Sequence, residues 1–163
     1  MQTVSGLPAH VLLVHAIVVL LPLSAALLAL TAVWPAGRRR LAGPNAVLSV
    51  LVVVLVPITT GAGEWLEHRV APNPLVHRHA ELGDTAIYAA IGVAALALVV
   101  WWRQRESSGR TPARRMFLAP SSNAVTVTLT VLAIVVSAAA VYDVVRIGDS
   151  GAKASWSNWA ARP

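Results

Sequence analysis

The chain has 163 residues, of which 56% are hydrophobic and 12% charged, and its mean hydropathy is +0.66. A soluble domain needs more polar surface than this composition supplies, so we expect the chain to lie in a lipid bilayer. The formal net charge of +6 does not indicate nucleic-acid binding, because the arginines stand between apolar segments. Cysteine is absent, which excludes disulfides, thiolate-held iron–sulfur clusters, thiol catalysis and covalent c-type haem attachment.

Four apolar segments are each close to the roughly 20 residues that span the hydrocarbon of a bilayer. They cover approximately residues 8–34, 46–65, 84–102 and 124–143. The predicted fold class is therefore all-α, a membrane-embedded four-helix bundle contained in residues 1–146. Residues 147–163 are more polar, and we expect them to form a tail outside the membrane, either along the interface or disordered.

The charged residues divide between the two ends of this predicted bundle. Eight of the thirteen basic residues lie in two segments, 38–40 and 103–115, together with one carboxylate, Glu106. The other end holds five basic residues, six carboxylates and all five histidines. The positive-inside rule places the arginine-rich turns in the cytoplasm and both termini outside. Because arginine far outnumbers lysine, and Ala and Val abound, we expect a multi-pass protein of a bacterial plasma membrane.

The third span is predicted to begin before its apolar run. Asn73 followed by Pro74 matches a helix N-cap with proline at the first helical position. A helix that starts there would carry His77, His79 and Glu81 above the bilayer before it enters the membrane.

Small residues mark helix contacts in membranes, so we use them to assign the inward faces. A stripe of small residues begins at His79 on the third span, and a similar one begins at His15 on the first. We therefore expect His15 to be more buried than His10, whereas His77 should face elsewhere and His68 should be an ordinary interfacial residue. The two stripes continue through Gly83, Ala86, Ala90 and Ala94, and through Val18, Pro22, Ala25, Ala29 and Ala32.

Four spans bring a polar side chain to a similar depth at the end opposite the arginines. Glu64 ends the second apolar segment and Asp143 ends the fourth. Since a charge inside hydrocarbon costs roughly 2.5–3.5 kcal/mol, we expect these groups to sit at the membrane boundary. There they would pair with one another or with Arg69 and Arg146.

Three motifs resemble the bacterial membrane family DUF2231. They are GLPAHVLLVH at residues 6–15, TTGAGEWL at 59–66 and HAELGD at 79–84. The fourth span is similar to the family only as a hydrophobic segment. The resemblance implies a four-helix membrane domain, carries no activity with it, and places His10, His15, Glu64 and His79 within motif positions.

Two functions of different classes follow from these residues. The first is a non-catalytic accessory or assembly subunit, whose His and carboxylate cluster, including Asp143 and Arg146, locks the outer ends of the helices. Its partners would be lipid and other membrane proteins or further copies of the chain. The alternative is a redox protein that binds haem b or a transition metal through His15 and His79, with His10 and Glu64 as further ligands. The sequence contains no nucleophile elbow or nucleotide-binding loop that would indicate a conventional enzyme.

Overall fold

The computed structural model describes residues 3–4, 6–109, 118 and 122–156. Within them the helices are α1 (Ala9–Val33), α2 (Pro35–Glu67), α3 (Pro74–Gly83), α4 (Ala86–Ser107) and α5 (Asn123–Trp156). Helices α3 and α4 follow one another as a single interrupted span, so the described residues contain four helical stretches long and apolar enough to cross a membrane. The predicted all-α four-helix fold is confirmed.

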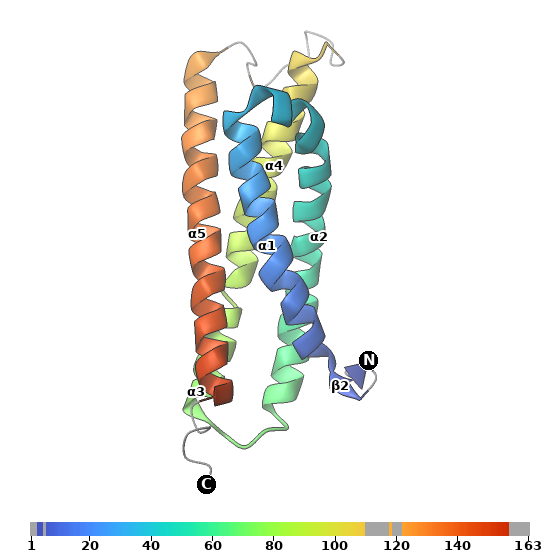
Figure 1. Cartoon of the computed structure of the whole chain (residues 1–163), viewed down its shortest axis with the longest axis vertical. Coiled ribbons are helices and arrows are strands. Elements are labelled where there is room, and N and C mark those ends of the chain that lie inside the picture. Colours follow the sequence, from blue (N-terminus) through green and yellow to red (C-terminus); the bar gives the residue numbers. More distant parts are fainter. Residues whose placement is uncertain (1–2, 5, 110–117, 119–121, 157–163) are drawn as a thin grey trace.

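The spans run antiparallel to their neighbours in sequence (Figure 1). Helix α1 contacts α2 and α5 most extensively, and α4 contacts α2 and α5 from behind. The start of α1 and the end of α5 lie at the same end of the bundle as α3, which we name the histidine end. The junction of α1 with α2, the end of α4 and the start of α5 form the opposite, arginine end. A short hairpin of two strands of two residues each, β1 (Thr3–Val4) and β2 (Leu7–Pro8), precedes α1.

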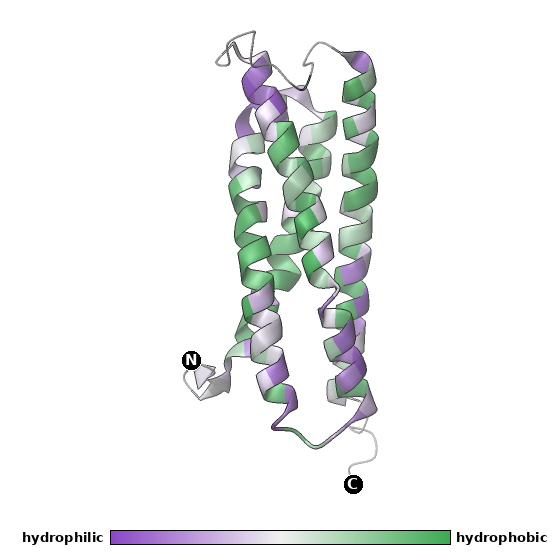
Figure 2. Ribbon diagram, turned by 180° about the vertical axis from the view of Figure 1, so that it is seen from behind, coloured by the Kyte–Doolittle hydropathy of each residue, from purple (hydrophilic) through white to green (hydrophobic). Residues whose placement is uncertain are grey.

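The helices expose apolar side chains outward and pack small ones inward. In lipid each backbone N–H and C=O must be satisfied inside its own segment, which long helices achieve. Figure 2 shows hydrophobic residues along the middle of the bundle and hydrophilic residues at both ends. The predicted stripe on the third span is confirmed, because Ala86, Ala90 and Ala94 are all buried.

The start of α3 agrees with the sequence prediction. The helix begins at Pro74, and the Asn73 side chain accepts a hydrogen bond of 2.9 Å from the backbone N–H of Leu75. This N-cap satisfies one of the donors that the first helical turn leaves open. The histidines of α3 are therefore carried on a helix that precedes the fully apolar part of the span.

Two boundaries differ from the predicted ones. Helix α2 begins at Pro35, so the arginines at 38–40 lie on its first turns rather than in a loop. Proline suits the first helical position because its missing N–H would have no helical partner there. Helix α5 continues through residues 147–156, which we expected to be a separate tail. These residues pack against α3, whereas the rest of the predicted tail, 157–163, lies outside the described residues.

Candidate functional site

A small pocket of about 50 Å³ opens at the histidine end of the bundle. All five helices contribute to its walls, which are almost wholly apolar apart from two imidazoles and two threonines. An apolar lining with a few polar groups is the usual composition of a small-molecule or cofactor site. Its lining residues are His10, Val14, Ile17, Val18, Val56, Thr59, Thr60, His79, Gly83, Ala86, Val144 and Ile147.

The imidazole of His10 is anchored to the second helix. Its Nδ1 lies 2.9 Å from the backbone oxygen of Thr59, and because a carbonyl only accepts, Nδ1–H is the donor. The ring also lies against Gly63, where an added Cβ would come within 2.9 Å of Cε1 and Nδ1. A glycine at position 63 is therefore what leaves room for this ring.

His79 is held in the same way by the last helix. Its Nδ1 lies 3.1 Å from the backbone oxygen of Ile147 and 3.0 Å from the Ser150 hydroxyl, which itself donates to Ile147. A Cβ at Gly151 would stand 3.0 Å from the ring Cε1. The centroids of the His79 and His10 rings are 6.3 Å apart, and the ring planes meet at 74°. Both rings therefore use Nδ1 as a donor and keep the lone pair on Nε2.

The expectation that His15 is the buried histidine of the first span is wrong. His15 is exposed, and its ring Nδ1 contacts the backbone oxygen of Val11 on the same helix. At 100° per residue, His10 lies about 20° from the fully buried Leu21, whereas His15 lies about 120° from it. The small-residue stripe advances only about 3.4 residues per step, so it winds around the helix and leaves the core before it reaches His15.

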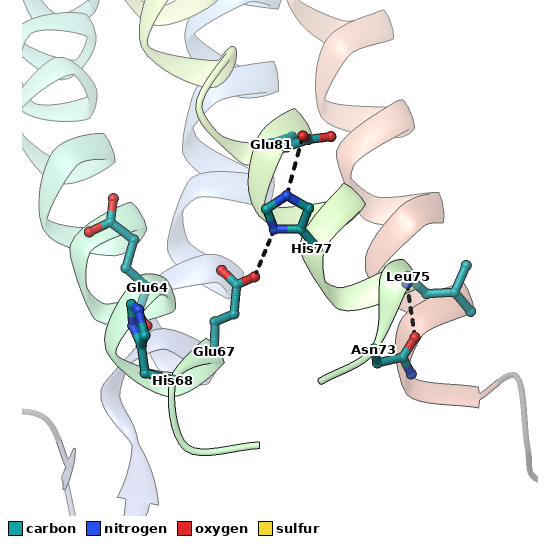
Figure 3. A network of polar contacts seen from close by, with 7 residues as sticks. All are labelled: Glu64, Glu67, His68, Asn73, Leu75, His77 and Glu81. Carbon is teal, nitrogen blue, oxygen red and sulfur yellow. Dashed lines mark hydrogen bonds and ion pairs between the residues drawn. The ribbon is translucent and has the colours of Figure 1, made fainter. Parts of the chain in front are cut away.

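The structure places Glu64 away from the two pocket histidines. Its side chain is exposed and does not line the pocket, while its backbone oxygen accepts a hydrogen bond from the ring of His68. Figure 3 shows the Glu64 carboxylate turned away from His77, which instead lies between two other carboxylates. The His77 ring is 3.2 Å from Glu67 and 3.4 Å from Glu81. His77 therefore ties α2 to α3 outside the pocket.

Asp143 and Arg146 do not pair with each other or with the histidines in the described contacts. The Asp143 carboxylate accepts from the hydroxyl of Thr85, with the oxygens 2.9 and 3.1 Å away. Arg146 lies over the ring of Tyr142, with its guanidinium carbon 5.8 Å from the ring centre. Asp143 thus joins α5 to the α3–α4 junction, and the expected ion pairs with Arg146 are not formed in the part of the chain that the structure describes.

Among the described residues, no group of three or more His, Asp or Glu side chains is placed to hold a metal ion. A zinc site needs three or four protein ligands in tetrahedral geometry. His10 and His79 could therefore bind only a metal that receives most of its ligands from another group, such as a cofactor.

The motifs that surround these two histidines match a known family over nearly the whole chain. A family model described as a predicted membrane protein, DUF2231, matches residues 6–160. The chain belongs to the DUF2231 family. Neither a curated protein nor a solved structure matches it.

In this DUF2231 protein the three sequence motifs meet at the pocket. The first supplies His10, the second Thr59 and Gly63, and the third His79 and Gly83. Sequence reasoning missed the contribution of the last helix, because Ser150 and Gly151 fall in the segment that we expected to be a tail. It also missed the contact between Gly63 and His10, for which the only signal was a glycine within a predicted membrane helix.

Proposed function

We propose that this membrane protein binds haem b at the pocket of its histidine end, where His10 and His79 would hold it. This assignment replaces His15 by His10 in the pair expected from the sequence. The observation that carries the proposal is the geometry of the two imidazoles, which come from different helices and share one apolar pocket.

The Nδ1 atoms of the two rings make the hydrogen bonds that metal-binding histidines commonly make. A histidine that binds a metal through one nitrogen commonly donates its other N–H to a backbone carbonyl, which fixes the tautomer and the ring orientation. His10 donates to Thr59 O and His79 to Ile147 O. The nitrogen left with a lone pair is Nε2 in both rings.

The two imidazoles are also close enough to hold one group together. Their ring centroids are 6.3 Å apart and their planes meet at 74°, and both rings line the same pocket. His10 and His79 would hold haem b through ring nitrogens.

The set of available donors favours haem over a bare ion. Haem iron takes four ligands from its macrocycle and needs only axial ligands from the protein. This matches two histidines with no third ligand grouped beside them among the described residues. The walls around the two rings are almost wholly apolar, as is usual for cofactor sites. Bound haem would supply one-electron transfer at one side of the membrane.

We further propose that the protein crosses a bacterial plasma membrane with its arginine end in the cytoplasm. The arrangement of the arginines on α2 and α4 supports this orientation through the positive-inside rule. The haem site would then face the periplasmic side.

Absorption spectroscopy tests the haem proposal directly. The full chain, expressed with haem supply and purified in detergent, should show a Soret band and about one haem per chain by pyridine haemochrome. His10→Ala and His79→Ala should each abolish the band. His15→Ala and His77→Ala, which alter histidines outside the pocket, should retain it.

A loss of fold is separated from a loss of ligand by chemical rescue. Added imidazole should restore the band in His10→Ala if the pocket is intact. A wild-type protein that remains colourless with haem supplied, or a band that depends on His15 rather than His10, would refute the proposal. The accessory or assembly role would then be the better assignment.

A further inference from the structure

One histidine of α3 lies outside the pocket, between two carboxylates. The His77 ring lies between Glu67, the last residue of α2, and Glu81, one turn further along α3 (Figure 3). Its Nδ1 is 3.2 Å from a Glu67 oxygen, and its Nε2 is 3.4 Å from a Glu81 oxygen. The His77 side chain is 69% exposed, so its protonation state follows the pH of the solution.

The protonation state of His77 decides how these contacts act. A carboxylate accepts hydrogen bonds but does not donate them, and a neutral imidazole has a single N–H. Neutral His77 therefore donates to one carboxylate at most, and its other nitrogen presents a lone pair to the second. The imidazolium carries an N–H on both nitrogens and a positive charge, so it attracts Glu67 and Glu81 together.

The two carboxylates have no other cation beside them. Among the described residues, no arginine or lysine nitrogen lies within 4.0 Å of a Glu67 or Glu81 oxygen. Arg69, two residues beyond Glu67, lies over the ring of Trp65, with its guanidinium carbon 3.8 Å from the ring centre. With a neutral His77 the site therefore holds two negative charges and no positive one.

The neighbouring helices bring no further carboxylate to His77 among the described residues. The Glu64 carboxylate of α2 is turned away from His77 (Figure 3). Helix α5 also packs against α3, and its Asp149 and Lys153 pair with each other at 2.6 Å. The residue of α3 that contacts α5 is His79, which lies two positions, or about 200°, around the helix from His77.

The contact of His77 with Glu67 joins two helices that share few others. In the part of the chain that the structure describes, it is the only hydrogen bond or ion pair between side chains of α2 and α3. None of the residues of α3 is fully buried. A segment with little buried surface opens at a small free-energy cost, so one polar contact can change how often α3 detaches.

We propose that His77 is a pH-sensitive latch, which holds α3 against α2 more firmly when its ring is protonated. An imidazole changes its charge between about pH 8 and pH 5, so the latch strengthens as the pH falls through this range. Because α3 also carries His79, closing the latch holds this pocket histidine in place. The latch does not require haem, so either proposal can fail without the other.

Hydrogen–deuterium exchange tests the latch on the full chain in detergent. The opening constant of α3 is obtained from its amide exchange at about pH 8 and about pH 5.5, after correction for the intrinsic exchange rates. Lowering the pH should reduce this constant about two- to tenfold more in the wild type than in His77→Gln, which is the effect of two exposed ion pairs. His79 lies on the same helix and titrates in both proteins, so its contribution cancels in this comparison.

Two matched variants complete the test. His68→Gln removes another exposed histidine of the same end, whose described contact is with a backbone oxygen, and it should keep the wild-type response to pH. Glu67→Gln keeps the His77 ring but removes the negative charge on α2, and it should lose most of the response. The proposal is overturned by an equal response in the wild type and His77→Gln, by a full response in Glu67→Gln, or by equal losses in His68→Gln and His77→Gln.

Discussion

Replacing Gly63 by alanine should destabilise the histidine end of the bundle. The new methyl group would lie 2.9 Å from both Cε1 and Nδ1 of His10, so the ring must move by about 0.5 Å to reach an ordinary contact distance near 3.4 Å. That movement would lengthen the bond to Thr59 O, now 2.9 Å, past the usual limit of about 3.2 Å.

The expected cost can be worked out against a control on the same helix. Overpacking costs about 1–3 kcal/mol, which includes the weakened hydrogen bond of about 0.5–1.5 kcal/mol. Replacing glycine by alanine inside a helix stabilises the helix by about 1 kcal/mol, because alanine has the higher helix propensity. Gly61→Ala has the same gain but no described atom within 4 Å of its Cβ. The difference between the two variants, about 1–3 kcal/mol, is therefore free of the helix-propensity contribution.

Unfolding in mixed micelles of increasing SDS content, followed by circular dichroism, measures both variants. The reasoning is refuted if Gly63→Ala and Gly61→Ala have free energies of unfolding within 0.5 kcal/mol of each other, about the scatter of independent sites. A double-mutant cycle adds a second criterion. In a His10→Ala background the ring is absent, so Gly63→Ala and Gly61→Ala should have the same effect on the free energy of unfolding.

The same design applies to the other ring. A Cβ at Gly151 would stand 3.0 Å from Cε1 and 3.3 Å from Nδ1 of His79, whereas one at Gly148 would have no described neighbour within 4 Å. The contact is slightly looser than at Gly63, so Gly151→Ala should cost less, near the lower end of the roughly 1–3 kcal/mol range for overpacking. Loss of stability in Gly148→Ala alone would contradict this account.

Two further predictions concern the bundle as a whole. Ala90→Leu changes a side chain that is 1% exposed and should destabilise the bundle by about 1–3 kcal/mol. Ala95→Leu changes an exposed position of the same helix and should leave the stability nearly unchanged. Equal unfolding curves for the two variants would contradict the assignment of Ala90 to the inward face of α4. For the orientation, a single cysteine at the exposed Ser108 should resist impermeant thiol reagents in intact cells, whereas one at the exposed Ala71 should react. Labelling at Ser108 from outside would reverse the proposed orientation.

Local sequence signals predicted much of the fold. The four apolar segments and the Asn73–Pro74 cap each depend on a few neighbouring residues, and the structure confirms them. The buried face of α4 was also predictable, because Ala86, Ala90 and Ala94 repeat at intervals of four.

The pocket depended on information that no single helix contains. His10 was predicted only as a further ligand, because the small-residue stripe that begins at His15 indicated another face of α1. The winding of that stripe becomes visible only against a packed neighbour. The contacts of Gly63 with His10 and of Gly151 with His79 depend on how far one helix slides along another. That register is a property of the whole bundle. In addition, residues 147–156 are polar in composition, so the sequence did not indicate that they belong to the bundle.

The break between α3 and α4 has a consequence for the local stability of the histidine end. None of the ten residues of α3, all described, is fully buried, so this helix is less enclosed than α1, α2, α4 and α5. Segments with so few buried contacts open at a small free-energy cost while the remaining structure stays folded. Opening of α3 would break the contacts of His79 with Ile147 and Ser150, so we expect the histidine end to open before the middle of the bundle. Amide hydrogens of α3 should accordingly exchange with solvent well before those of α1 or α4.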